Sequence, residues 1–337
     1  MENSPITYKK IADALNVSQS TVSKALSGSR EVSADMAEKI YLAAKEMGYF
    51  TQKRERNREY AKNFCPEIAV FVPEIVSIHY SELATEFVRE IESVGGKASL
   101  YITGFNSNEV GKRLADVYDK VHFDGVILLS SCNYVGEVKL PTMALGGGLW
   151  TARFDSLNSD IKSGMKEALE HLMSLGHTEI GFAGENLTIG KEKAFRKALD
   201  KAGLSAKEEY IFCISDRFEH IGVEVGNRIA GLEKRPTAIM TAYDEIAIGL
   251  ISSLASHGIR VPEDISIIGM NDIPVAEYLN PPLTTIVTRT KEKCSIAVDF
   301  LMRKIKEHQN GKFESHMEFS TTLVVRESTG KAKIYSK

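Results

Sequence analysis

The sequence predicts an α/β protein with a two-lobed core of doubly wound parallel sheets, preceded by a small all-α helix-turn-helix domain. Three observations predict this fold. The length of 337 residues suits about two ordinary domains and one small module. From residue 67 onward, apolar strand-like runs alternate with amphipathic helix-like runs, and this alternation occurs in two successive series. Near the amino terminus, three short helical patterns surround a polar segment.

Polar residues that favour helix caps precede each of the three amino-terminal patterns. The caps are Thr7, Ser18 and Ser33, and the helices cover residues 8–16, 19–26 and 34–48. We expect Asn16 to end the first helix in a left-handed conformation, and Gly28 and Gly48 to stop the other two. Two short helices across a tight turn, braced by a third, make a helix-turn-helix unit.

The second of these helices has a strongly polar face. Gln19 and Ser20 at its amino end can hydrogen-bond base edges, and Lys24 can reach a guanine or a phosphate. The helix amino termini offer N–H groups to phosphate oxygens. The DNA-contacting candidates of the head are Thr7, Ser18, Gln19, Ser20, Thr21, Ser23, Lys24 and Ser33. The alternative is a solvated three-helix cap that binds nothing.

Charge is distributed unevenly along the chain. Residues 1–62 hold 11 Lys or Arg against 8 Asp or Glu, whereas the remainder holds 31 against 37. A basic head on an acidic body indicates a polyanion partner for the head alone. Residues 51–63 have no apolar stripe and are typical of a basic linker, in which Lys53, Arg54 and Arg58 are further DNA-contacting candidates.

The body is predicted as two strand–helix series, which favour parallel sheets covered on both faces. In the first series we expect strands over 67–72, 97–103, 124–130 and 141–148, with helices over 80–96 and 109–121. In the second we expect helices over 163–177, 191–204 and 244–259, with strands over 178–184, 210–214, 237–242 and 264–270. In such sheets, ligands bind in a crevice at the carboxyl ends of the strands.

Several classes of protein are not expected. No apolar run approaches the roughly 18 residues of a membrane-spanning helix, and no secretory signal pattern opens the sequence, so we expect a cytoplasmic protein without a membrane partner. The four cysteines lie far apart and are expected to be isolated buried thiols. The histidines show no metal spacing, Gly146–Gly148 lacks the spacing of a phosphate loop, and no Ser–His–Asp order stands out. We therefore expect no metal, no cofactor and no catalysis.

The motif "ADALNVSQSTVSKALSG", followed by "EVS" and "MGY", resembles the head of the LacI/GalR family of bacterial repressors. It departs from the family pattern at Asn16, where glycine is usual, and at Lys24, where arginine is usual. The segments "EALEHLMSLGHTEIGFAG", "IGMNDIPVAEYLNPPLTTI" and "LVVREST" look like the effector-binding core of the same family, which resembles periplasmic sugar-binding proteins.

This resemblance implies the domain organisation. A DNA-binding domain would occupy residues 1–50, a linker or hinge 51–65, and an effector-binding and dimerisation core 66–330. Within the core, lobe 1 would cover about 66–158 and 287–317, and lobe 2 about 159–286 and 318–330. The family places Asn, Ala and Leu on a hinge helix at positions held here by Gln52, Glu55 and Arg58. A charged residue cannot act as an apolar minor-groove wedge, so we expect a weakly kinked or unkinked operator, with looser coupling between head and body.

The resemblance also places an effector between the lobes. The positions carried over are Tyr80, Gly146, Lys191, Arg217, Phe218, Tyr243, Asp244 and Asn271. Ring faces with amide and charged partners suit a sugar or another polyol. Lys191 and Arg217 equally suit a phosphate or carboxylate. Alternatively, these side chains only line a solvated cleft, and Asp244 caps the helix that it begins.

Together, these features predict a homodimeric transcription regulator that binds a pseudo-palindromic site on double-stranded DNA. We expect a repressor of carbohydrate-use genes, controlled by a sugar or sugar derivative. Two heads related by two-fold symmetry read more base pairs than one short helix can. The rival interpretations are a solute-binding module without DNA output and an α/β sugar enzyme.

Overall fold

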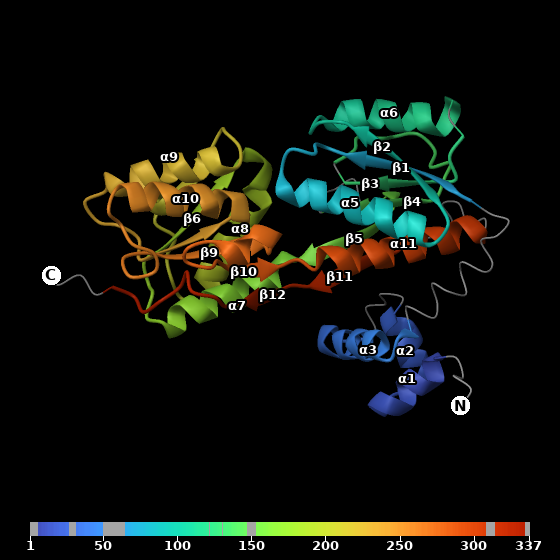
Figure 1. Ribbon diagram of the computed structural model, residues 1–337, viewed down its shortest axis with the longest axis horizontal. Helices are drawn as coiled ribbons and strands as arrows, with labels where there is room; N and C mark the ends of the chain where they lie inside the picture. The colour runs from blue at the N-terminus through green and yellow to red at the C-terminus, as the bar shows by residue number, and fades with distance from the viewer. Residues whose placement is uncertain are drawn as a thin grey trace. The chain divides into compact units, whose positions relative to one another are not determined.

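A computed structural model of the chain describes residues 6–26, 32–49, 65–120, 122–129, 131–146, 153–307 and 314–333 (Figure 1). The chain divides into two compact units. Unit 1 comprises Met1–Val76, Tyr80–Ser159 and Thr290–Phe319, and unit 2 comprises Ser77–His79, Asp160–Arg289 and Ser320–Lys337. The domain boundaries that we expect from the sequence stay a prediction.

Three helices form the amino-terminal head: α1 (Tyr8–Leu15), α2 (Gln19–Leu26) and α3 (Ala34–Glu46). Their shared core consists of Ile11, Ala12, Val22, Ile40, Ala44 and Tyr49. Asn16 ends α1 in the left-handed region with φ 51°, as predicted. Capping agrees at two of the three expected positions, because Thr7 Oγ1 accepts from Lys10 N at 3.4 Å and Ser18 Oγ accepts from Thr21 N at 3.0 Å.

The third cap differs from the prediction. Ser33 occupies the position before α3 with extended backbone, but its side chain makes no capping hydrogen bond to the described residues. The helix also ends at Glu46, two residues before Gly48, which adopts φ 76°. Gly28 and the linker residues Gln52, Lys53, Arg54, Glu55 and Arg58 lie outside the described residues.

Unit 1 contains a sheet with the strand order β11-β5-β4-β3-β1-β2, six strands within the part of the chain that the structure describes. The strands are β1 (Glu67–Val72), β2 (Lys97–Ile102), β3 (Gly125–Leu128), β4 (Thr142–Leu145), β5 (Asp155–Asp160) and β11 (His316–Ser320). The helices are α5 (Ile78–Ser93), α6 (Ser107–Lys120) and α11 (Thr290–Lys306).

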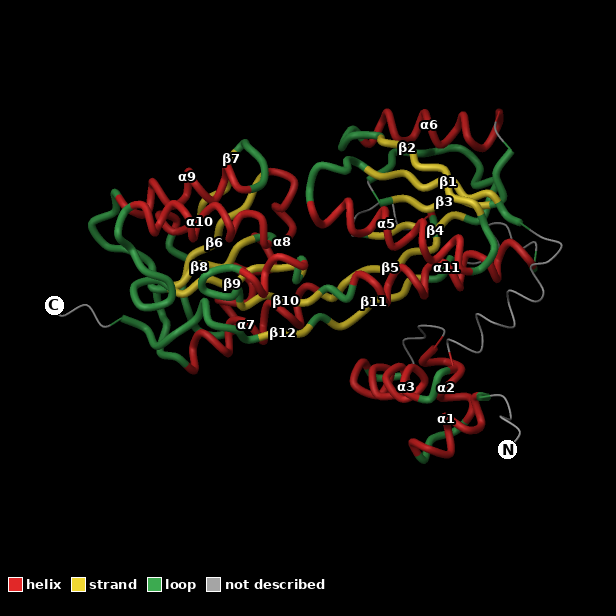
Figure 2. Tube along the Cα trace, in the orientation of Figure 1, coloured by secondary structure: helices red, strands yellow, loops and turns green. Residues whose placement is uncertain are grey.

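Strand β1 shows why this sheet needs helices on both faces. Ile68, Val70 and Val72 pack in the cluster that includes α5 and α11, whereas the alternate residues Ala69 and Phe71 pack in the cluster that includes α6. Because both sets of side chains on β1 are apolar, neither face can be left in water. Figure 2 shows the helices flanking these strands.

Unit 2 repeats this architecture with the strand order β12-β10-β9-β8-β6-β7, again six strands among the described residues. The strands are β6 (Ile180–Glu185), β7 (Ile211–Ile214), β8 (Ala238–Thr241), β9 (Ser266–Asn271), β10 (Thr284–Val287) and β12 (Thr322–Val324). Its helices are α7 (Ile161–Ser174), α8 (Ile189–Lys201), α9 (Glu219–Ala230) and α10 (Asp244–Ser256). Strand β12 pairs antiparallel with β10, whereas β10 with β9, β9 with β8, β8 with β6 and β6 with β7 pair in parallel.

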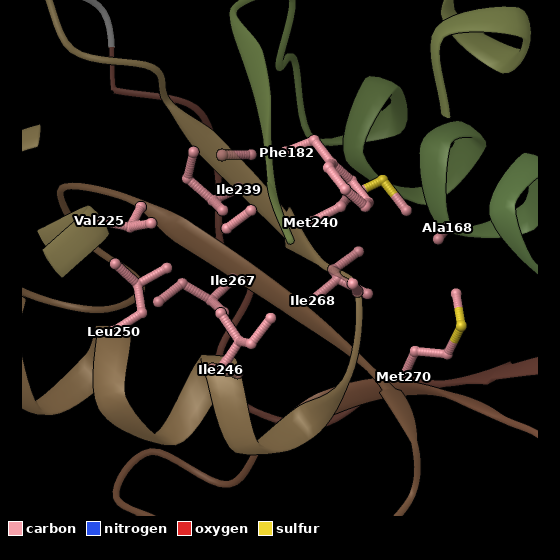
Figure 3. Packing of buried hydrophobic residues seen from close by; sticks show 14 of the residues in the cluster. Ala168, Phe182, Val225, Ile239, Met240, Ile246, Leu250, Ile267, Ile268 and Met270 are labelled. Atoms are coloured by element: carbon pink, nitrogen blue, oxygen red, sulfur yellow. The ribbon is translucent and has the colours of Figure 1, made fainter. Parts of the chain in front are cut away.

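The core of unit 2 lies on both faces of its central strands. In Figure 3, Ile239 and Ile267 lie toward Ile246 and Leu250 of α10, and the side chains of Met240 and Ile268 lie on the other face of the strands. Consecutive residues of β8 and β9 thus serve opposite faces, as the pleat of a strand requires. The predicted α/β fold class is confirmed.

Helix α9 was not among the elements expected from the sequence. It packs closely on α10 through glycines: a Cβ at Gly222 would lie 2.1 Å from Ile246 O, and one at Gly249 would lie 2.0 Å from Glu219 O. Glycine lowers helix propensity, which hides α9 in the sequence, but here it lets two backbones approach.

No described helix is long and apolar enough to cross a membrane. Three or more His, Cys, Asp or Glu side chains do not gather anywhere in the described chain in a way that would hold a metal ion. Cys132 and Cys294 are buried as expected, whereas Cys65 and Cys213 are exposed because each lies outside the apolar clusters.

Candidate DNA-reading surface and effector site

The exposed surface of the head begins at the amino end of α2. Gln19 and Ser20, the first two residues of that helix, are exposed, whereas Val22 is fully buried against the other head helices. Ser18 and Thr21 are joined by a hydrogen bond of 2.8 Å between their hydroxyl oxygens, which fixes the first turn. This geometry leaves two hydrogen-bonding side chains in solvent at the end of α2, where a helix that enters a major groove reads bases.

The remaining head candidates have other surroundings. Thr21, Ser23 and Lys24 are partly buried, Ser33 is exposed, and the Thr7 hydroxyl caps α1. Lys53, Arg54 and Arg58 lie outside the described residues. The structure therefore leaves Gln19 and Ser20 exposed at the start of α2, and their role in base reading stays a prediction.

In unit 2, the parallel register brings several predicted effector residues to one edge of the sheet. Met240 of β8 pairs with Phe182 of β6 and with Ile268 of β9. Three residues beyond each of these positions, the chain reaches Tyr243, Glu185 and Asn271, respectively, so these three residues lie at a similar level of the sheet. This edge is formed by the carboxyl ends of the strands, where α/β sheets bind ligands.

Lys191 reaches this edge from the first turn of α8. Its Nζ donates to Ala242 O at 2.7 Å and lies 6.0 Å from the centre of the Tyr243 ring. Burial lowers the pKa of Lys191 to about 8, against the opposing effect of Glu245, Asp244 and Glu185. An ammonium with so few water contacts favours a site that brings it an acceptor.

Tyr243 is the centre of a hydrogen-bonded network. Its ring is buried, and its hydroxyl donates to Glu185 Oε1 at 2.7 Å. The hydroxyl oxygen of Tyr243 in turn accepts a hydrogen bond from Phe218 N at 3.1 Å. Burial raises the pKa of Tyr243, so the hydroxyl keeps its proton. The ring of Tyr243, one of the predicted effector residues, thus packs in the core of unit 2, and its hydroxyl holds two neighbouring groups.

Arg217 and Phe218 close the network. Arg217 Nε lies 3.3 Å from Glu185 Oε2, and its guanidinium carbon lies 4.4 Å from the centre of the Phe218 ring. Phe218 adopts φ 59° and ψ −137°, a conformation that costs a residue with a side chain about 1–3 kcal/mol. The hydrogen bond from Phe218 N to Tyr243 helps to hold this strained backbone at the site.

Asp244 is fully buried and stabilises the edge of the sheet through two hydrogen bonds. Its Oδ1 accepts from Thr285 Oγ1 at 2.6 Å and its Oδ2 from Ile273 N at 2.9 Å, while the N-cap position of α10 belongs to Tyr243. Burial raises the pKa of Asp244 to about 7. The carboxyl group thus ties β10 and the segment after β9 to α10. A Cβ at Gly269 would lie 2.0 Å from Asp244 Oδ1, so only glycine fits there.

Asn271 and the two first-unit candidates complete the set. Asn271 ends β9 with φ 111° and is 8% exposed. In unit 1, the Tyr80 ring packs edge-on against Phe105 with centroids 5.8 Å apart, and Gly146 follows β4 with φ 112° and open space around its Cα. The structure brings Lys191, Arg217, Phe218, Tyr243, Asp244 and Asn271 together in unit 2.

Two acidic residues of this edge were missed in the sequence. Glu185 ends the buried strand β6 and Glu245 lies in the first turn of α10, and both are almost fully buried. A glutamate directly after an apolar strand was a visible signal for Glu185. Glu245 looked like an ordinary acidic residue at a helix start.

A helix-turn-helix head on two doubly wound units, one of which gathers polar groups at a sheet edge, defines a DNA-binding regulator with an effector domain. Residues 7–52 match the family model described as bacterial regulatory proteins, lacI family, and residues 169–329 match the periplasmic binding protein-like domain. The chain belongs to the lacI family and is a DNA-binding transcriptional repressor with a periplasmic-binding-protein-like effector domain.

Known proteins resemble the chain over nearly its whole length. The HTH-type transcriptional repressor PurR of Vibrio parahaemolyticus is 29% identical over 343 residues, which cover 96% of this chain and 99% of PurR. The transcriptional regulator CelR, solved as a cellobiose complex, superposes with a TM-score of 0.66 at 22% identity, covering 96% of this chain and 99% of CelR. The lac repressor dimer, solved bound to operator and the anti-inducer ONPF, gives 0.69 at 20%, covering 97% and 100%. The two solved structures show the shared fold, and PurR is a repressor rather than an enzyme.

Proposed function

We propose that this repressor controls carbohydrate-use genes and that a sugar-like effector, bound at the carboxyl edge of the unit 2 sheet, changes its affinity for an operator. The observation that carries the proposal is the convergence of ring, amide and charged groups at that edge. Phe218 supplies a partly exposed ring beside Arg217, Lys191 supplies donors, and Asn271 supplies an amide. Sugars need this combination of a flat apolar surface and fixed hydrogen-bonding partners.

On the DNA side, the proposal assigns base reading to Gln19 and Ser20, and we propose a homodimer on a pseudo-palindromic operator. One short helix contacts few base pairs, whereas a two-fold pair doubles the readout and fixes the half-site spacing. The lac repressor, which shares this fold, was solved as a dimer bound to operator, and this supports the proposal.

Two observations bear on the chemical class of the effector, and each favours a different candidate. CelR, which has the same fold, was solved with cellobiose, and this favours a neutral sugar such as a disaccharide. A second candidate is an anionic sugar, because Lys191 and Arg217 both bring positive charge to the edge. Arginine and lysine are the usual partners of carboxylate and phosphate groups.

The test starts with the full chain and fragments of its own genome. Sequencing the DNA that the protein enriches should yield a two-fold symmetric site beside carbohydrate-use genes. Fluorescence anisotropy on that site should then show a change in affinity when one sugar of a panel is added. Enriched DNA without two-fold symmetry, or an operator affinity that no sugar alters, would contradict the proposal.

A thermal-shift screen provides an independent measure of binding. A ligand present at 100 times its dissociation constant should stabilise the folded protein by about 2.7 kcal/mol. Neutral sugars, sugar acids and sugar phosphates are compared at equal concentration. The compound that gives the largest shift should be the one that alters operator binding.

A further inference from the structure

One buried carboxylate oxygen at the effector edge has no hydrogen-bond partner in the part of the chain that the structure describes. Glu245 is 2% exposed, and its Oε1 accepts from His79 N at 3.4 Å. Its Oε2 has no hydrogen-bond partner among the described residues. Buried polar atoms in folded proteins nearly always have a partner, so this oxygen calls for a donor that the described residues do not supply.

The partly buried ammonium of Lys191 has donors to spare. Lys191 Nζ carries three N–H donors, and Ala242 O is its hydrogen-bond acceptor at 2.7 Å. Ion pairs among the described residues include none between Lys191 and a carboxylate. Ala242 lies only three residues before Glu245, and Glu245 exerts the largest electrostatic attraction on Lys191. The two charges therefore attract each other without touching.

The group that completes this arrangement must accept a hydrogen bond from an ammonium and donate one to a carboxylate. A hydroxyl does both, because it has one donor and two acceptor lone pairs. A carboxylate or phosphate only accepts, and it would add negative charge beside Glu245 and Glu185, both of which attract Lys191. The positive charge of Arg217 is already paired with Glu185.

We infer that Lys191 and Glu245 form a subsite for one hydroxyl of a neutral polyol, and that this subsite selects against sugar acids and sugar phosphates. The inference rests on the proposed function, and it chooses between the two effector classes named there. Glu245 becomes the residue that gives the site this specificity.

The experiment is isothermal titration calorimetry on the full chain. The probes are cellobiose, D-glucose, D-glucuronate and D-glucose 6-phosphate, followed by single-deoxy analogues of the best neutral sugar. We expect the neutral sugar to bind at least about tenfold more tightly than its acidic counterparts. Glu245→Gln should weaken that binding about tenfold or more, because a hydrogen bond to a charged group is lost. Glu219→Gln is the matched control: Glu219 is an exposed acid in the first turn of α9, and this variant should bind within about twofold of the parent protein.

A deoxy analogue identifies the hydroxyl. The analogue that lacks it should bind weakly to the parent protein and no more weakly to Glu245→Gln, because the two changes remove the same contact. Circular dichroism checks the folding of the variant. Should Glu245→Gln fail to fold, Lys191→Met must show the same loss for the same analogue.

The outcomes separate the subsite from the proposed function. Neutral sugar binding that Glu245→Gln leaves unchanged, or tighter binding of an acidic counterpart, overturns the subsite while the proposed function stands. If no probe binds the parent protein and none alters its operator affinity, the proposed function fails and the subsite fails with it.

Discussion

The hydroxyl of Tyr243 holds the strained segment at the effector edge, and Tyr243→Phe removes that hydroxyl alone. The ring stays in the core of unit 2, so no cavity forms. Two groups lose a partner: Glu185, whose side chain is 5% exposed, loses a donor at 2.7 Å, and Phe218 N–H loses an acceptor at 3.1 Å.

The magnitude follows from these two bonds. A hydrogen bond to a charged group contributes about 1.5–3 kcal/mol, and the carboxylate bond to Glu185 belongs to this class. We therefore expect Tyr243→Phe to lower the free energy of unfolding of unit 2 by about 1.5–3 kcal/mol. Tyr278→Phe is the matched control, because Tyr278 is 78% exposed and its loss should change stability by no more than about 0.5 kcal/mol.

Urea unfolding followed by circular dichroism measures the two variants. Hydrogen exchange of the Phe218 amide gives a local readout, since that N–H donates to the Tyr243 hydroxyl. Exchange at Phe218 should accelerate in Tyr243→Phe only. Equal unfolding midpoints for both variants, with unchanged exchange at Phe218, would refute the role assigned to the hydroxyl.

Three further predictions follow from the head and the core of unit 2. Gln19→Ala should cost about 1–3 kcal/mol on the cognate operator and relax specificity at one or two base pairs; competition binding that preserves the ranking of operator variants would contradict this. Gly249→Ala places a Cβ 2.0 Å from Glu219 O and should destabilise the protein by about 1–3 kcal/mol. Gly190→Ala, which has open space around it in α8, should stabilise the protein by about 0.4–1 kcal/mol. Equal melting temperatures of the two variants would argue against this packing. The native state keeps the Asp244 proton up to about pH 7, whereas the unfolded chain loses it near pH 4. The free energy of unfolding should therefore fall as pH rises from 4 to 7, by at most about 1.4 kcal/mol per pH unit. Asp244→Asn should remove that part of the pH dependence, and an unchanged slope in this variant would show that Asp244 does not titrate this way.

Local signals explain what could be predicted from the sequence. The head helices follow from caps such as Thr7 and Ser18 and from the left-handed Asn16, all of which act within a few residues. The alternation of apolar strands with amphipathic helices gives the fold class in the same way. Helix α9 was missed because Gly222 and Gly226 look like breakers, and their use depends on contacts with α10 that are distant in sequence.

The site shows the same division. Lys191, Arg217 and Tyr243 were found by position, but the buried role of the Tyr243 hydroxyl depends on Glu185, at the end of the neighbouring strand β6. Asp244 was placed correctly at the helix start, yet it binds Thr285 and Ile273 rather than capping α10. Cross-strand and loop partners of this kind depend on the register of the sheet, which cannot be derived from local sequence patterns.

The proposed function depends on control of DNA binding by a ligand at the unit 2 edge. It is tested most directly by fluorescence anisotropy of the full chain on its enriched operator, with and without the best sugar, in the parent protein and in Lys191→Met. We expect the sugar to change the operator dissociation constant of the parent protein about tenfold, within the usual range of coupling between two sites. Lys191→Met should bind the operator as tightly as the parent protein does and no longer respond to the sugar. A parent protein that ignores every sugar, or a Lys191→Met variant that responds as fully as the parent, would contradict it.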